Sequence, residues 1–190
     1  MIRTLNINEI ENLYKERIRK DFPLMERRPL FIMKRLYAQN RYQCLVLEEE
    51  NQILAYASFL CDQSIHNVLL DYFAVEKNLR GSGVGSKFFS LLSQYWTKKD
   101  SIILECENPT TTKNQTEKVI RERRISFYTR GGAIKTTLDW KIFGVNYNIL
   151  WLPIHSEMEE DTIDKDLIKL YTLSLPSFIR KLFLKKRNHK

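Results

Sequence analysis

Apolar and polar positions follow a helical period over the first forty residues of the chain. The apolar residues at helical spacing are Ile10, Leu13, Tyr14 and Ile18. Asn8 followed by Glu11 is a helix-start signal, and Pro23 ends the pattern. Pro29 suits the first turn of a second helix. The segment therefore predicts two helices after a short strand at residues 2–5.

The period changes to that of strands after residue 40. Apolar runs separated by polar turns predict strands at residues 42–47, 53–61, 69–75, 101–107, 133–143 and 147–154. Helical patterns lie at residues 84–98 and 116–128, the second opened by Thr116 as a cap. Short turns make the strands from 42 to 75 an antiparallel meander. The helix at 84–98 then predicts a parallel crossover, and the last two strands predict a hairpin.

A different pattern begins after residue 155, where an acidic linker leads into another helix. The residues at helical spacing are Ile163, Leu167, Leu170, Tyr171 and Ser174. Pro176 ends this helix, and residues 178–183 form a further amphipathic stretch before a basic tail. That stretch could pack on the domain, join a second subunit in a homodimer, or lie on a membrane. We divide the chain into a domain at 1–155 and a helical extension with a basic tail at 156–190.

The net charge of +8 comes mostly from this tail. Six of the 31 basic residues lie in residues 180–190, which hold no acid, so the rest has 25 basic against 23 acidic residues. A nucleic-acid-binding surface spread over the domain is therefore not indicated. The tail alone could contact RNA, an anionic membrane or an acidic partner.

Cysteine usage and hydropathy point to the cytoplasm. Cys44, Cys61 and Cys106 are widely spaced in apolar segments, which is typical of free thiols in a reducing compartment. The first residues show no secretory signal, and no apolar run reaches the roughly 20 residues that span a bilayer. The histidines are scattered, so no metal site is expected.

A glycine loop separates the strand at 69–75 from the helix that follows. Three of the six glycines lie between Gly81 and Gly85. Such a loop at a helix start favours a phosphate, because it presents free N–H groups and the positive end of the helix dipole. Ser86 and Lys87 exclude a Walker loop, and the G-x-G-x-G spacing excludes the dinucleotide fingerprint. A tight turn without a ligand is the alternative.

The loop resembles the Arg/Gln-x-x-Gly-x-Gly/Ala loop of the GNAT family of N-acetyltransferases, as Arg80, Gly83 and Gly85. Phe127-Tyr128 followed by Gly132 resembles the family's helix-end pattern, although Ala133 replaces its usual large apolar residue. The order of elements also agrees. The resemblance covers residues 1–154 and implies an α/β (α+β) fold with a mixed, mostly antiparallel central sheet flanked by helices.

The resemblance also implies acetyl-CoA as the co-substrate and the residues that hold it. In the family the loop cradles the pyrophosphate, and the strand before it bonds the pantetheine arm at a splayed edge. An Asn opening the helix after the fifth strand corresponds by position to Asn114, after an unusually long polar loop. The implied cofactor-binding residues are Phe73, Ala74, Val75, Arg80, Gly81, Ser82, Gly83, Val84, Gly85, Ser86, Asn114 and Tyr128.

Catalytic roles follow the same resemblance. Tyr128 matches a tyrosine that protonates the leaving thiolate. Glu105 falls where ribosomal-protein acetyltransferases of the family carry a general base, which removes a proton from the amine. Asp71 is a second candidate because it interrupts a strand expected to be central, where a carboxylate must be paired or functional. We expect it to share a face with Phe73 and Val75.

The sequence thus predicts an N-acetyltransferase that moves the acetyl group of acetyl-CoA directly to an amine of a small molecule, peptide or protein. Two alternatives stay open. A non-catalytic acyl-CoA-binding sensor or scaffold would keep the Gly83 and Gly85 loop without transfer. An RNA- or membrane-associated protein would depend on the basic tail instead.

Overall fold

A computed structural model of the chain describes residues 1–155, 159–175 and 184–187. Within these residues the strands form one eight-stranded sheet in the order β1-β2-β3-β4-β5-β7-β6-β8. The strands are β1 (Ile2–Thr4), β2 (Tyr42–Glu49), β3 (Gln52–Leu60), β4 (Asn67–Val75), β5 (Ser101–Glu107), β6 (Ile134–Ile142), β7 (Val145–Pro153) and β8 (Leu184–Arg187). The β4–β5 pair is parallel and the other six pairs are antiparallel. The predicted fold class, meander, crossover and hairpin are confirmed.

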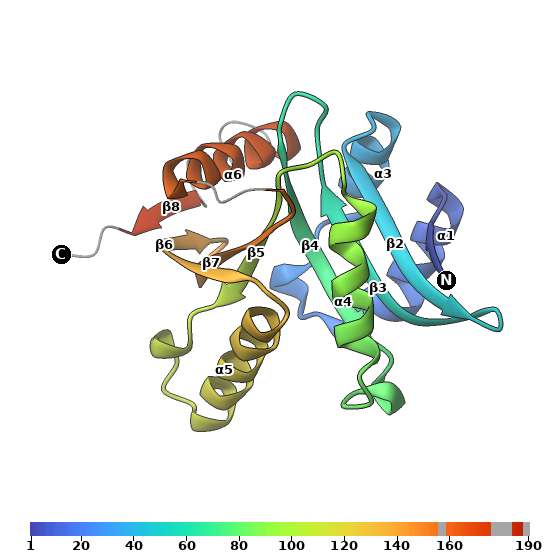
Figure 1. The fold of residues 1–190 in the computed structure, drawn as a ribbon, viewed down its shortest axis with the longest axis horizontal. Helices are drawn as coiled ribbons and strands as arrows, with labels where there is room; N and C mark the ends of the chain where they lie inside the picture. The colour runs from blue at the N-terminus through green and yellow to red at the C-terminus, as the bar shows by residue number, and fades with distance from the viewer. Residues whose placement is uncertain (156–158, 176–183, 188–190) are drawn as a thin grey trace.

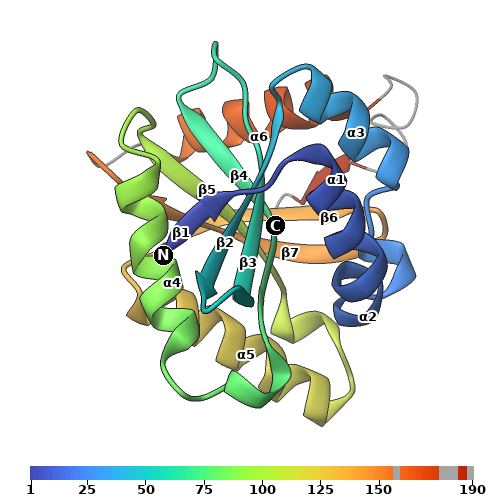
Figure 2. The same ribbon diagram turned by 90° about the vertical axis from the view of Figure 1, so that its right-hand side faces the viewer.

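The helices cover both faces of this sheet. They are α1 (Ile7–Leu13), α2 (Arg19–Asp21), α3 (Leu30–Ala38), α4 (Val84–Tyr95), α5 (Gln115–Arg130) and α6 (Glu160–Ser174). One buried cluster joins α4 and α5 to the sheet through residues such as Phe88 and Tyr128. The other joins α1, α3 and α6 through residues such as Ile10, Leu36 and Leu167. Figures 1 and 2 show α4 and α5 on one side of the strands and α1 and α3 on the other.

The first helix starts two residues earlier than the sequence suggests. Asn6 is the cap: its side chain accepts hydrogen bonds from the N–H groups of Asn8 and Glu9, and Glu9 returns a bond to the Asn6 N–H. This pair satisfies helix-start donors reciprocally. The predicted signal at Asn8 and Glu11 was wrong because Asn6-Ile7-Asn8-Glu9 offers the same spacing one step upstream. The helix ends before Pro23, as expected.

The described residues after position 155, at 159–175 and 184–187, pack onto the sheet. The five residues predicted at helical spacing in α6 are all buried. β8 was not predicted: it pairs antiparallel with β6, and Lys186 bonds Asp164 of α6. The basic LKKR sequence lacks the alternation that would mark a strand. The predicted amphipathic stretch at 178–183 lies outside the described residues. No helix among the described residues is long and apolar enough to cross a membrane.

Candidate active site

The parallel strands β4 and β5 separate partway along their length. They pair from Asn67–Ser101 to Leu70–Leu104 and no further. Beyond that point β4 continues beside β3, and β5 continues beside β7. The facing edges of residues 71–75 and 105–107 therefore have no strand partner in the described part of the chain. Figure 1 shows the two strands diverging toward their C-terminal ends.

A β-bulge sits where the strands separate. β3 pairs Ser58 with Tyr72 and Phe59 with Leu70, so Asp71 is the extra residue of β4. A bulge places two successive residues on one face and bends the strand. Asp71 and Tyr72 accordingly both face α3, while Phe73 packs among residues of α4 and α5. The expectation that Asp71 shares a face with Phe73 and Val75 was wrong, because alternation assumes a regular strand.

The Asp71 carboxylate is held by an ion pair. Arg28 Nε and Nη2 donate to its two oxygens at 3.1 and 2.9 Å, and the Tyr42 hydroxyl donates at 3.2 Å. The Arg28 and Asp71 side chains are only 8% and 11% exposed. Burial alone would lower the pKa of Arg28, but the charge of Asp71 outweighs it and raises that pKa. The buried charge of Asp71 is thus compensated by a forked, two-point contact.

A cavity of about 340 Å³ opens at the gap between the strands. Its walls include Leu104, Phe73 and Tyr128 from the face that packs on α4 and α5. They also include Ile32, Tyr72 and other residues from the face that packs on α3 and α6. Residues from both faces of the sheet therefore line the cavity. All three predicted catalytic residues, Asp71, Glu105 and Tyr128, line it.

Glu105 faces this cavity from β5, near the point where the strands separate. The Tyr171 hydroxyl of α6 lies 2.9 Å from each of its carboxylate oxygens. Burial raises the pKa of Glu105 to about 8, and the nearby charge of Asp71 adds to this rise. The Tyr171 hydrogen bond and the charge of Arg28 both oppose it. A carboxyl group with a pKa near neutral can exchange a proton at physiological pH, which is what a general base requires.

Tyr128 lies across the cavity, on the last turns of α5. Its ring packs against Phe89 and Phe127, with centroids 5.1 Å away in both cases, and against Phe73 at 6.1 Å. Gly131 ends the helix, and a Cβ there would lie 2.6 Å from the Phe89 ring. Burial raises the pKa of Tyr128. Its hydroxyl therefore keeps its proton at neutral pH and is available as a donor.

The glycine loop joins the end of β4 to the start of α4. Gly81 and Gly83 have φ angles of +84° and +89°, a region that glycine adopts without strain. Gly85 is required for another reason: a Cβ there would lie 3.1 Å from Val75 Cγ2. The loop residues from Arg80 to Gly83 are exposed. The N–H groups of the first α4 turn have no partners within the helix, so they face the position expected for a phosphate.

Residues 40–132 match the family model described as acetyltransferase (GNAT) domain. This segment contains the glycine loop, both diverging strands and the Tyr128 helix end. Residues 40–132 belong to the GNAT family.

Solved structures share the fold of the chain. A protein described as a GNAT-family acetyltransferase from Bacteroides thetaiotaomicron is 19% identical, with a TM-score of 0.70, over 91% of this chain and 97% of that one. The ribosomal-protein-S18-alanine N-acetyltransferase of Escherichia coli is 19% identical, with a TM-score of 0.57, over 84% and 96%. A Bacillus subtilis acetyltransferase in complex with CoA is 15% identical, with a TM-score of 0.54, over 81% and 98%. A comparison with curated proteins finds no match.

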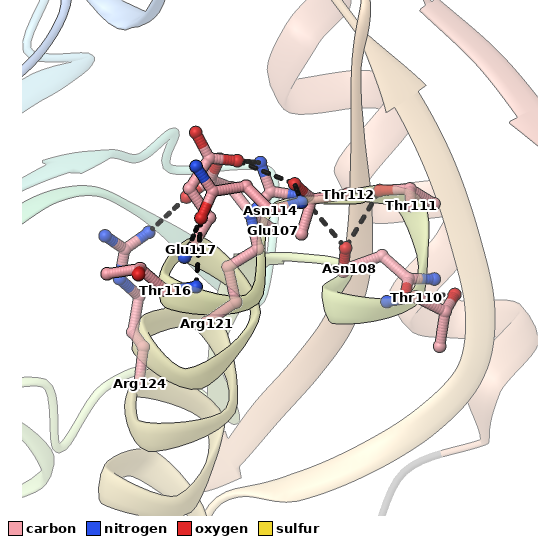
Figure 3. Close-up of polar contacts among 10 residues, drawn as sticks. All are labelled: Glu107, Asn108, Thr110, Thr111, Thr112, Asn114, Thr116, Glu117, Arg121 and Arg124. Carbon is pink, nitrogen blue, oxygen red and sulfur yellow. Dashed lines mark hydrogen bonds and ion pairs between the residues drawn. The ribbon is translucent and has the colours of Figure 1, made fainter.

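The loop before α5 departs from the brief connection that the GNAT resemblance implies. Asn114 caps α5, accepting from the N–H groups of Thr116 and Glu117, so the helix begins before the predicted cap at Thr116. Figure 3 shows Arg121 and Arg124 of α5 reaching toward Glu107, to which they lie 3.0 Å away. Asn114 thus opens the helix, as the GNAT pattern expects, and is exposed.

Several predicted GNAT site residues stand apart from the cavity. The loop residues Arg80 to Ser86 and Asn114 do not line it, whereas Phe73 does. Arg80 donates to the Val75 carbonyl at 3.3 Å and lies 3.7 Å from Asp21. Ala74 is buried and Val75 contacts the glycine loop at Gly85. A cofactor that reaches both the glycine loop and the cavity would have to follow the free edge of β4, which lies between them.

Sequence reasoning missed two residues that touch the candidate catalytic groups. Arg28 lay among eight basic residues in the first two helices, and nothing in its spacing marks it as buried. Tyr171 was identified only as part of an apolar stripe in α6. The single signal for Arg28 was Asp71 itself, since a carboxylate inside a central strand demands a cationic partner.

Proposed function

We propose that the chain is an acetyl-CoA-dependent N-acetyltransferase that transfers directly within a ternary complex. The observation that carries the proposal is the cavity at the gap between β4 and β5, with Glu105 and Tyr128 both in its walls. Direct transfer needs the acetyl donor and the amine to enter from opposite sides and meet at one point. A cavity at the gap between the strands, lined by residues from both faces of the sheet, suits such a meeting point.

The chain's own groups fit acetyl-CoA in three places. The α4 start and the glycines at 81 and 83 suit a pyrophosphate. The unpaired edge of residues 73–75 suits the amide groups of the pantetheine arm, which can bond as another strand would. The apolar wall of Phe73 and Leu104 suits the acetyl end. Bound there, acetyl-CoA supplies an activated thioester.

Glu105 is the proposed general base and Tyr128 the proposed general acid. Glu105 takes a proton from the acceptor ammonium, so that the neutral amine can attack the thioester carbonyl. Tyr128 donates a proton to the departing thiolate as the C–S bond breaks, and takes one back from the nitrogen, which loses its second proton as the amide forms. Glu105 then returns its proton to solvent. Asp71 is a weaker candidate for the base, because Arg28 and Tyr42 already occupy its oxygens. Its proposed role is to hold the bulge that opens the strands.

The acceptor that fits this cavity is a small primary amine or one extended chain terminus. A volume of about 340 Å³ lies at the lower end for small-molecule sites and excludes a folded surface. Aromatic walls from Phe22 and Tyr147 suit an apolar body, and burial raises the pKa of Glu26 at the same wall. The three cysteines are free thiols, so we propose a cytoplasmic enzyme.

The test is release of free thiol from acetyl-CoA against a panel of small amines and short peptides. Wild-type protein is expected to release thiol with at least one amine. Gly83→Asp should remove CoA binding, and Tyr128→Phe should retain binding but slow release. CoA binding without release for any amine would instead indicate a non-catalytic acyl-CoA-binding protein. Absence of both would overturn the proposal.

A further inference from the structure

We propose that Tyr171 of α6 is a positioning residue that orients Glu105 and favours its ionised, proton-accepting form over its neutral form. The inference rests on the proposed function, because it assumes that Glu105 is the base. It adds to the reaction a residue that lies outside the matched domain at residues 40–132. The C-terminal extension then supplies part of the active site instead of merely packing on it.

The contact between the two side chains is symmetrical. The Tyr171 hydroxyl lies 2.9 Å from Glu105 Oε1 and 2.9 Å from Oε2. Its single proton is therefore shared between the two oxygens, and the hydroxyl holds the carboxylate group as a whole. An ionised carboxylate has about four acceptor positions, so others remain for the amine proton. Both residues line the cavity, which places this arrangement at the reacting centre.

The position of Tyr171 relative to Glu105 is fixed, because buried hydrogen bonds join α6 to the sheet. Asn67 of β4 donates to Asp166 at 2.9 Å, and Trp140 of β6 donates to Asp164 at 2.8 Å. Asp164 and Asp166 are 7% and 5% exposed. Two anchors on different strands fix the helix on the turns before Tyr171. The hydroxyl is therefore held in place before any substrate arrives.

The chemistry of the bond favours the charged form of Glu105. A hydrogen bond from a hydroxyl to a carboxylate is stronger than one to a neutral carboxylic acid, so it stabilises the ionised form of Glu105. The groups that face Glu105 on this side of the sheet are Asp71 of β4, Arg28 before α3, Tyr147 of β7 and Tyr171 of α6. Asp71 opposes ionisation and Arg28 favours it, but each is already engaged with the other. Tyr171 provides the direct bond.

Tyr171→Phe tests this role because it removes only the hydroxyl. We expect the acid limb of the kcat/KM profile to move to higher pH by about one unit. At pH values below the limb kcat/KM should fall about tenfold, and above it kcat/KM should change little. A purely structural role would lower the rate equally at every pH. Tyr147→Phe is the matched control: it makes the same change in the same cavity, but within the described part of the chain Tyr147 makes no hydrogen bond to Glu105. Its acid limb should stay in place.

A second measurement needs no turnover. Infrared difference titration of wild type against Glu105→Gln gives the ionisation of that one carboxyl group in the substrate-free protein. In the Tyr171→Phe background the midpoint should rise, whereas in the Tyr147→Phe background it should not. An unchanged midpoint and an unchanged acid limb would overturn the inference while leaving transfer by the wild type intact. A wild-type protein without transfer but with the shifted midpoint would overturn the proposed function alone.

Discussion

Arg28 and Asp71 form a two-point ion pair at the residue where β4 bulges away from β3. The guanidinium donates at 3.1 and 2.9 Å, and both side chains are almost completely buried. The bulge turns Asp71 toward α3 and lets the strand leave β5 immediately afterwards. The pair thus stabilises the local backbone geometry that opens the sheet.

Arg28→Met should destabilise the fold by about 3–5 kcal/mol, because it leaves the Asp71 charge buried with only the Tyr42 hydroxyl as a donor. The free energy of unfolding from denaturant titration measures this. Adding Asp71→Asn should recover part of the loss, since the uncompensated charge disappears. Lys165→Met removes an exposed partner of Asp161 and should leave the unfolding midpoint unchanged. A loss below about 1 kcal/mol for Arg28→Met would contradict the structural role.

Gly83→Asp should weaken CoA binding by about a hundredfold or more without unfolding the protein. Gly83 is the N-cap of α4 with a φ of +89°, so the substitution adds backbone strain as well as a negative charge beside the helix start. The same negative charge repels a pyrophosphate. Isothermal titration with CoA measures the effect. Gly144→Asp has a comparable φ of +87° at the β6–β7 turn and should leave the affinity unchanged.

Glu105→Gln should stabilise the protein above neutral pH. The folded pKa of about 8 lies above the ordinary value of 4.5, so the unfolded chain loses its proton first as the pH rises. Ionisation then favours the unfolded state from about pH 4.5 up to pH 8. Removing the carboxyl group should therefore gain roughly 3 kcal/mol at pH 7 and almost nothing at pH 4. Thermal unfolding at a series of pH values measures the difference, and a gain independent of pH would refute the assigned shift.

Tyr128→Phe should lower kcat by about a hundredfold with little change in KM for acetyl-CoA, because only protonation of the leaving thiolate is lost. Stopped-flow detection of free thiol measures it. Tyr95→Phe is a control outside the cavity: its hydroxyl accepts a hydrogen bond from the Gln43 side chain, far from Glu105 in the sequence and absent from the cavity walls, and the rate should not change. Equal losses in the two variants would indicate a packing effect.

The course of the chain was largely predictable because its signals are local. Alternation, glycine turns and helical spacing identify each strand from β1 to β7 and the three long helices α4, α5 and α6. The start of α1 was missed because two Asn–Glu pairs lie at equivalent spacing, and only the fold shows that Asn6 is the cap. β8 was missed because its short basic sequence gains strand geometry only by pairing with β6.

The site was predictable only in part because its contacts are distant in sequence. Glu105, Tyr128 and Asp71 could be named from motif positions, and the cavity contains all three. The ion pair of Asp71 spans 43 residues, and the Glu105–Tyr171 contact spans 66. No pattern within a window of ordinary length links such residues. The bulge that reverses the facing of Asp71 likewise follows from pairing with β3 and not from the strand alone.

The 66 residues between Glu105 and Tyr171 have a consequence for the order in which the site is synthesised. Ribosomes deliver β4, the glycine loop, β5, α5 and the β6–β7 hairpin well before α6. A product terminated after β7 would carry the proposed phosphate loop, base and acid, yet it would lack both the Tyr171 hydroxyl and the buried side chains that α6 adds to the core. Translation past α6 therefore completes the core and the proposed catalytic site together.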